Sequence, residues 1–146
     1  MRTGTKTRIG VFTATRAEYG LLRPLLERLD SSDRLEPHLI VSGTHLSPRH
    51  GMTVSEIEAD GRPIAARIPV PLAADDGVSV AQDMAAVLAD AAEAYATLRL
   101  DAVLILGDRT EALRLRQRQC RLVSLSSTSK AASGPKERWT ITFVMP

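Results

Sequence analysis

One arginine stands where a buried strand would end and a helix would begin. Residues 8–13 form a short apolar run, residues 19–29 repeat apolar side chains at helical spacing, and Arg16 lies between them. The free N–H groups and the dipole of a helix N-terminus attract an anion. A guanidinium beside them can hold phosphate through two parallel hydrogen bonds. Arg16 is therefore a candidate anion-binding residue; the alternative is a surface arginine paired with Glu18 or Asp108.

A second pair of charged residues follows another apolar run. Residues 101–106 are typical of a buried strand, and Asp108 and Arg109 come shortly after it. A carboxylate at the end of a buried strand is well placed for general acid–base catalysis, and equally well placed to cap the next helix. Arg109 could bind phosphate or pair with nearby acids. The residue types leave these alternatives open.

The three histidines and the single cysteine give no pattern of a metal or thiol site. His45 lies in a loop punctuated by glycine and proline, where a lone histidine is usually exposed to solvent. His38 and His50 have no metal-ligand spacing relative to it. Cys120 has no evident base partner, and one cysteine excludes an internal disulfide. Because the glycine-rich dinucleotide motif and the Walker A motif are also missing, we predict no cofactor and no metal.

The elements that must position these residues alternate between strand and helix. We expect strands at residues 8–13, 35–41, 65–70 and 101–106, helices at residues 19–30, 53–59 and 80–98, and a further helix after residue 107. Asp76 or Ser79 would cap the third helix. The alternation predicts an α/β fold, a parallel sheet with helices on both faces. Ligands bind such sheets outside the carboxyl ends of the strands, the edge where Arg16, His45 and Asp108 would lie.

Composition sets the class of protein. The 146 residues suffice for one domain, and 44% hydrophobic with 25% charged residues is normal for a soluble chain. Aromatic residues make up 3%, so the core must be built from Leu, Val, Ile and Ala. No apolar run approaches the roughly 18–20 residues of a membrane span, and no secretory signal is evident. We therefore expect a cytoplasmic protein without a membrane partner.

The net charge is unevenly distributed. Residues 1–113 hold 12 Lys+Arg and 16 Asp+Glu, a balance of −4, whereas residues 114–146 hold 7 and 1, a balance of +6. The formal charge of +2 is therefore a property of the tail, and the body is mildly acidic. No nucleic-acid partner is predicted.

Four motifs in order resemble those of the hydrolysing UDP-N-acetylglucosamine 2-epimerases, above all the sialic-acid biosynthesis branch. They are TATRAEYGLLRPLL at residues 13–26, VSGTHLS at 41–47, GMTVSEIEADG at 51–61 and LGDRTEAL at 106–113. The resemblance covers about residues 7–113. One departure is Ala14, where the family usually has glycine; the change is mild if the backbone keeps a negative φ.

The resemblance implies a fold, a reaction and roles for four residues. Family members have two Rossmann-like domains with the active site between them, similar to B-type glycosyltransferases, so residues 1–113 would form an incomplete N-terminal domain. They eliminate UDP from UDP-N-acetylglucosamine and hydrate the resulting glycal to N-acetylmannosamine, without metal or nicotinamide, and the full-length enzymes are homo-oligomeric. By resemblance, Asp108 is a catalytic carboxylate, Arg16 binds the diphosphate, and Arg109 and His45 belong to the UDP-sugar binding site.

Residues 114–146 depart abruptly from the family pattern. Residues 114–119 are Arg, Leu and Gln, unlike a helix packed on a sheet. Arg, Leu and Gln can be encoded by CGN, CTN and CAR codons. Read two bases out of frame, such codons encode only the small residues Ala, Ser, Pro and Thr. Further along the tail, a choice among synonymous codons gives, in the same displaced frame, a strand followed by a Gly-Gly-Glu motif. We therefore predict an out-of-frame, poorly ordered tail on an inactive fragment of the parent enzyme. The alternatives are a genuine divergent basic tail, and a stand-alone α/β nucleotide-binding or regulatory module without turnover.

Resequencing the locus through the codons for residues 114–146, and about 800 bases beyond, tests the tail, since a further domain of typical size needs roughly that length. We expect an epimerase reading frame displaced at about Arg114. A stop codon after Pro146 with no continuation in any frame would instead establish the tail as genuine.

Overall fold

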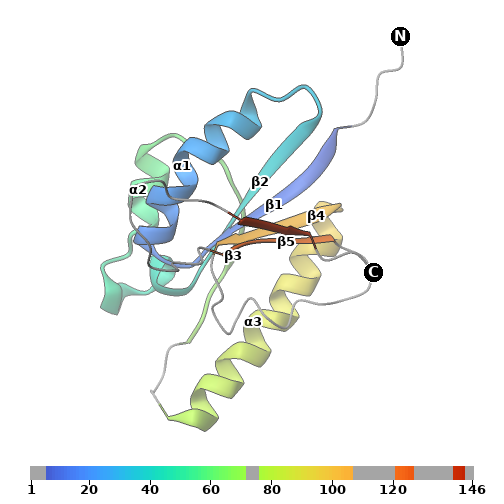
Figure 1. Ribbon diagram of the computed structural model, residues 1–146. Coiled ribbons are helices and arrows are strands. Elements are labelled where there is room, and N and C mark those ends of the chain that lie inside the picture. Colours follow the sequence, from blue (N-terminus) through green and yellow to red (C-terminus); the bar gives the residue numbers. More distant parts are fainter. Residues whose placement is uncertain (1–5, 72–75, 107–120, 127–139, 144–146) are drawn as a thin grey trace, which may run out of the picture.

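The computed structural model describes residues 6–71, 76–106, 121–126 and 140–143 (Figure 1). Asp108, Arg109 and Cys120 lie outside the described residues, as does the helix expected after residue 107. Two strands belong to the basic tail, and the rest of the tail is outside the described part. The poor order predicted for the tail therefore stays a prediction.

The described elements alternate as the sequence predicts. They are β1 (Thr7–Thr13), α1 (Arg16–Asp30), β2 (Leu35–Ser42), two short 3-10 turns (η1, Gly43–Leu46, and η2, Pro48–His50), α2 (Val54–Ala59), β3 (Ile64–Ile68), α3 (Gly77–Leu98), β4 (Ala102–Leu106), β5 (Arg121–Ser126) and β6 (Thr140–Phe143). The four strands and three helices expected before residue 107 are confirmed, with ends shifted by up to three residues. None of the helices in the described ranges is long and apolar enough to cross a bilayer.

The strands form one sheet in the order β3-β2-β1-β4-β5-β6. Neighbours from β3 to β5 run parallel, and β6 is antiparallel to β5. This order is that of a Rossmann-like fold, which confirms the predicted fold class. The connections reverse direction between β1 and β4, so the crevice that binds ligands in such sheets opens at the carboxyl ends of these two strands.

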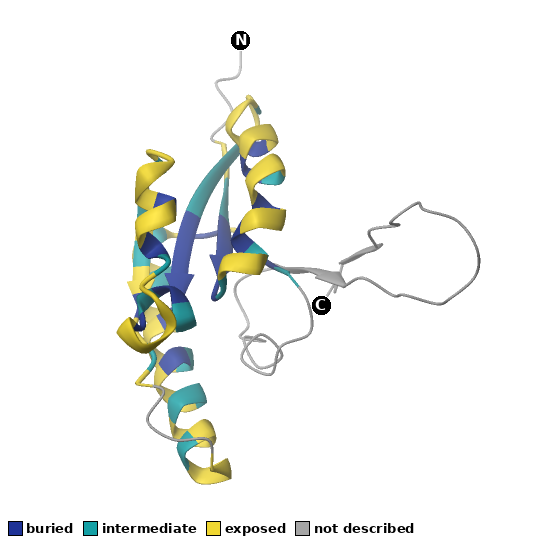
Figure 2. Ribbon diagram, turned by 90° about the vertical axis from the view of Figure 1, so that its left-hand side faces the viewer, coloured by how far each residue is buried: buried dark blue, intermediate teal, exposed yellow. Residues whose placement is uncertain are grey.

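Helices cover both faces of the sheet (Figure 2). On one face, α1 and α2 pack against the strand residues Val11, Leu39 and Leu104. On the other, α3 packs against Phe12, Ile40 and Val103. Adjacent residues of a strand point to opposite faces, so strands covered on both sides must be apolar at every position. This explains the continuous apolar runs in the sequence.

Side-chain caps fix where α1 and α3 begin. Thr15 precedes α1, and its hydroxyl accepts from the Glu18 N–H while the Glu18 carboxylate accepts from the Thr15 N–H, a capping box. Asp76 precedes α3 and accepts from the N–H groups of Val78 and Ser79 at 3.0 Å. Of the two caps considered for α3, Asp76 is therefore the one used.

Gly43 lets the chain turn sharply after β2. Its φ is +58°, and a Cβ built on it would lie 2.9 Å from the Ala14 carbonyl oxygen and 3.0 Å from the Ala14 Cβ. Ala14 itself has a negative φ, so alanine fits there without strain. The loop after β2 therefore packs directly on the end of β1, at the edge where the charged motifs lie.

Replacing Gly43 by alanine should lower the free energy of unfolding by about 2–4 kcal/mol, because a left-handed φ and a backbone contact act together. Gly61→Ala is the matched control: Gly61 has φ +68° but nothing within 4 Å of a built Cβ. It should cost about 1 kcal/mol. Urea denaturation measures both, and equal losses would show that the contact with Ala14 adds nothing.

Candidate functional site

The buried polar side chains gather at one edge of the sheet. Among the residues that the structure describes, they are Thr13, Ser42, His45 and Ser47, each at most 8% exposed. All four end β1 or β2 or follow directly after β2. Burying polar groups costs free energy unless they are hydrogen-bonded, so their concentration at the carboxyl ends of the strands marks this edge as the candidate site.

His45 lies at the centre of this polar group. Its ring is 1% exposed, with Nε2 at 3.0 Å from the Thr13 hydroxyl and Nδ1 at 2.8 Å from the Thr53 hydroxyl. The Tyr19 ring packs edge-on against it, with 6.3 Å between ring centroids. The expectation of a solvent-exposed histidine was wrong, because η1 turns the side chain inward under α1.

The hydrogen bonds assign the tautomer of His45. The Thr13 hydroxyl donates to the Thr15 carbonyl at 3.4 Å, so its oxygen is left to accept from the ring. We infer from this arrangement that Nε2 carries the hydrogen and that Nδ1 accepts from the Thr53 hydroxyl. Burial lowers the pKa of His45 below 6.5 and outweighs the opposing effects of the Thr15 carbonyl and the Glu56 carboxylate. The ring is thus neutral at physiological pH.

Arg16 is the first residue of α1, and its side chain is 73% exposed. Its Nε lies 2.9 Å from both carboxylate oxygens of Glu56, which belongs to α2. The sequence left open a pairing of Arg16 with Glu18; the ion-pair partner that the structure shows among the described residues is Glu56. Arg16 follows closely after β1, the strand next to β4 in the sheet, and its guanidinium is near solvent.

The Glu18 carboxylate engages two backbone N–H groups in the turn between β1 and α1. Its carboxylate accepts from the Ala14 N–H at 2.8 Å and from the Thr15 N–H at 3.3 Å. These two N–H groups, which precede the helix, are therefore already occupied. The N–H groups of Arg16 and Ala17, the first two of the helix, have no acceptor in the described part of the chain.

Asp108 and Arg109 lie outside the described residues, so their roles stay predictions. β4 ends at Leu106 and is hydrogen-bonded to β1 along its length. In the described part, the carboxyl end of β4 lies beside the carboxyl end of β1, where Phe12 pairs with Ile105.

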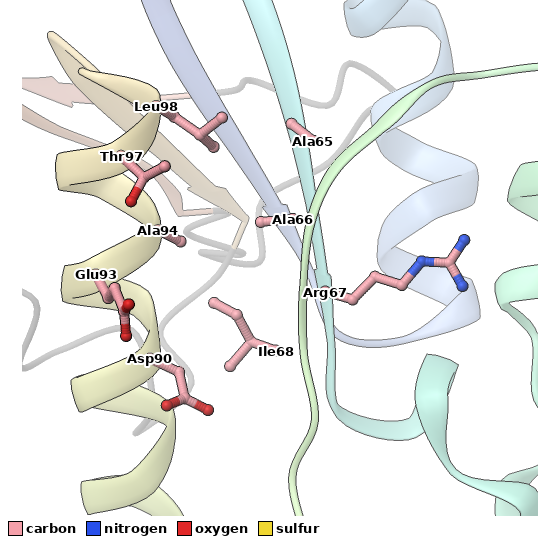
Figure 3. A pocket seen from close by; sticks show the side chains of 9 residues that line it. All are labelled: Ala65, Ala66, Arg67, Ile68, Asp90, Glu93, Ala94, Thr97 and Leu98. Carbon is pink, nitrogen blue, oxygen red and sulfur yellow. The ribbon is translucent and has the colours of Figure 1, made fainter.

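A hollow of about 290 Å³ lies elsewhere, between β3 and α3 (Figure 3). Its acidic groups, Asp90 and Glu93, come from one helix, while the Arg67 side chain points away from the hollow and pairs with Glu58. It flanks the sheet instead of opening at the carboxyl ends of the strands. We therefore do not assign the candidate site to it.

Comparison with known proteins identifies the family. The sequence profile of the UDP-N-acetylglucosamine 2-epimerase family matches residues 27–117. The chain belongs to this family. The matched range contains His45, Glu56, Asp108 and Arg109.

Two curated relatives are hydrolysing epimerases. The chain is 39% identical over 109 residues to the GDP/UDP-N,N'-diacetylbacillosamine 2-epimerase of Campylobacter jejuni, which covers 75% of this chain and 28% of that protein. It is 42% identical over 101 residues to the UDP-N,N'-diacetylbacillosamine 2-epimerase of Legionella pneumophila, which covers 69% and 27%. The chain thus spans less than a third of the length of these relatives.

A solved structure shares the fold. A protein from Listeria monocytogenes, described as a UDP-N-acetylglucosamine 2-epimerase, superposes with a TM-score of 0.69 at 19% identity. The match covers 85% of this chain and 32% of that one. The epimerase family therefore contains the sheet order and helix placement seen here.

Sequence reasoning missed two members of the site. Glu56 and Thr53 contact Arg16 and His45 from a segment that was read as a short helix without a chemical role. The pair Arg16–Glu56 spans 40 residues, so no local spacing reveals it. The one available signal was that both residues fall inside the third family-like motif.

The neutral state of His45 makes stability depend on pH. Below about pH 6.5 the unfolded chain binds a proton at His45, whereas burial of the ring opposes protonation in the folded chain. The contribution of His45 to the free energy of unfolding is therefore complete above pH 6.5 and is lost as the pH falls. We expect a decline of at most about 1.4 kcal/mol per pH unit. His45→Gln should be less stable and should lack this component, and His50→Gln at an exposed position should keep it. Urea titrations between pH 7.5 and 5 measure all three, and parallel slopes would contradict the assignment.

Proposed function

We propose that this chain is part of the N-terminal domain of a hydrolysing nucleotide-sugar 2-epimerase, and that Arg16 binds the diphosphate of its UDP-sugar. The observation that carries the proposal is the position of Arg16. It is the first residue of α1, just after the carboxyl end of β1, where Rossmann-like sheets generally bind ligands, and its guanidinium is exposed. Cations placed there act with the helix dipole on an anion.

The parent reaction would proceed by elimination and hydration. A base removes the proton at C2 while the bond from C1 to the diphosphate oxygen breaks, and UDP leaves with that electron pair. Water then adds across the glycal double bond, so UDP-N-acetylglucosamine and water give N-acetylmannosamine and UDP. Arg16 would stabilise the charge on the departing diphosphate, Asp108 would transfer a proton, Arg109 would contact the nucleotide, and His45 would order the site from beneath.

The substrate class is a UDP-linked sugar with an acetamido group at C2. By their names, both relatives act on nucleotide-linked N,N'-diacetylbacillosamine, a sugar with two N-acetyl groups. We propose UDP-N-acetylglucosamine as the parent substrate, after the family description, and the sialic-acid branch as its pathway, after the motifs in the sequence. The parent enzyme would be a cytoplasmic homo-oligomer.

For the 146-residue chain alone we propose binding without turnover. A closed cleft that excludes water needs groups from both sides of the substrate. The chain spans 28% of the Campylobacter jejuni relative. The family profile also ends at residue 117, close to residue 114 where we propose that the reading frame changes.

Calorimetric titration with UDP tests the binding role. We expect the unaltered chain to bind UDP and Arg16→Gln to bind about tenfold or more weakly, because a hydrogen-bonded charge pair is lost. Arg23→Gln is the matched control, since Arg23 lies on the same helix and pairs with Asp60. Equal affinities of the two variants would contradict the role of Arg16. Release of UDP from UDP-N-acetylglucosamine by the chain alone would contradict binding without turnover.

A further inference from the structure

Glu56 engages one side of the Arg16 guanidinium. Both carboxylate oxygens lie 2.9 Å from Nε, and within the described residues neither terminal Nη group has an acceptor. An arginine offers five N–H donors in a rigid fork, and two parallel donors suit a phosphate. A carboxylate held at Nε therefore leaves the Nη groups available to a ligand.

The helix that carries Glu56 is firmly anchored to the sheet. Val54 and Ile57 of α2 are at most 4% exposed and belong to the core on the α1 face. These contacts stabilise a six-residue helix, which would not be stable as an isolated segment. Glu56, on the exposed side of the same helix, is thereby brought to Arg16.

Thr53 ties the start of α2 to the end of β1. It occupies the position before the helix where a threonine normally caps the backbone, yet its side chain makes no capping hydrogen bond. Its hydroxyl bonds to Nδ1 of His45 instead, and Nε2 of His45 bonds to Thr13. The two segments that carry Arg16 and Glu56 are thus joined at a buried point as well as at the exposed ion pair.

We propose that Glu56 is a positioning residue for Arg16, and that the Thr53–His45–Thr13 bridge keeps Glu56 at the distance this requires. The inference rests on the proposed function, in which Arg16 binds the diphosphate of a UDP-sugar. Glu56 restricts the guanidinium to one orientation before the ligand arrives, so less side-chain entropy is lost on binding. Its own charge is balanced at Nε, on the other side of the guanidinium from the Nη groups.

Calorimetric titration with UDP tests the inference on the 146-residue chain. Glu56→Ala should weaken binding about two- to tenfold, the effect expected for ordering one long side chain. Glu56→Gln, which keeps an oxygen acceptor for Nε, should recover part of the loss, and Thr53→Val should weaken binding in the same direction. Glu58→Gln is the matched control, because Glu58 lies on the same helix with similar exposure and pairs with Arg67. It should leave the affinity unchanged.

A measurement without ligand separates this inference from the proposed function. The Nε–H resonance of Arg16 in a ¹⁵N-labelled chain should shift in Glu56→Ala, broaden in Thr53→Val and stay unchanged in Glu58→Gln. An unchanged resonance in Glu56→Ala, or UDP binding as tight as in the unaltered chain, would overturn the positioning role. A Glu56-dependent resonance in a chain that binds no UDP would support the positioning of Arg16 and overturn the proposed function.

Discussion

A neutral imidazole held between two threonine hydroxyls is the interaction on which the arrangement of this edge depends. A buried ring nitrogen without a partner would cost free energy comparable to a lost hydrogen bond. Satisfying both nitrogens of His45 requires Thr13 at the end of β1 and Thr53 before α2 to stay in place together. The end of β1, η1 and the start of α2 are thereby fixed around one side chain. Tyr19 of α1 closes the group, and its hydroxyl donates to Asp60 just after α2.

The charges at the surface of this edge follow from that buried arrangement. Glu18 satisfies the N–H groups of Ala14 and Thr15, and Glu56 satisfies Nε of Arg16. Each carboxylate neutralises part of the local positive potential and leaves, among the described residues, a defined set of donors: the N–H groups of Arg16 and Ala17 and the Nη groups of Arg16. Selectivity for a bound anion then depends on which donors remain, and less on the total positive charge.

Most of the fold could be predicted because its signals are local. Apolar runs, helical spacing and the cap at Asp76 are read from neighbouring residues, and alternation of strand and helix fixed the sheet type. The sequence also placed Arg16 and His45 at the correct edge. It could not show the burial of His45, because the direction of a 3-10 turn depends on tertiary contacts such as Thr44 with the Ala14 carbonyl. The partner of Arg16 was equally hidden, since Glu56 is brought to it by packing of α2.

The contact between Gly43 and Ala14 has a consequence for how this protein can change over time. The methyl group of Ala14 lies 3.0 Å from where a side chain at position 43 would begin, so the two positions share one small space. Position 43 is closed to a side chain by its left-handed φ and by the Ala14 carbonyl oxygen at 2.9 Å, and both obstacles exist whatever side chain stands at position 14. The dependence runs in one direction: the methyl group at position 14 is accommodated because position 43 has no side chain, so an exchange at position 14 is tolerated only while glycine is kept at position 43.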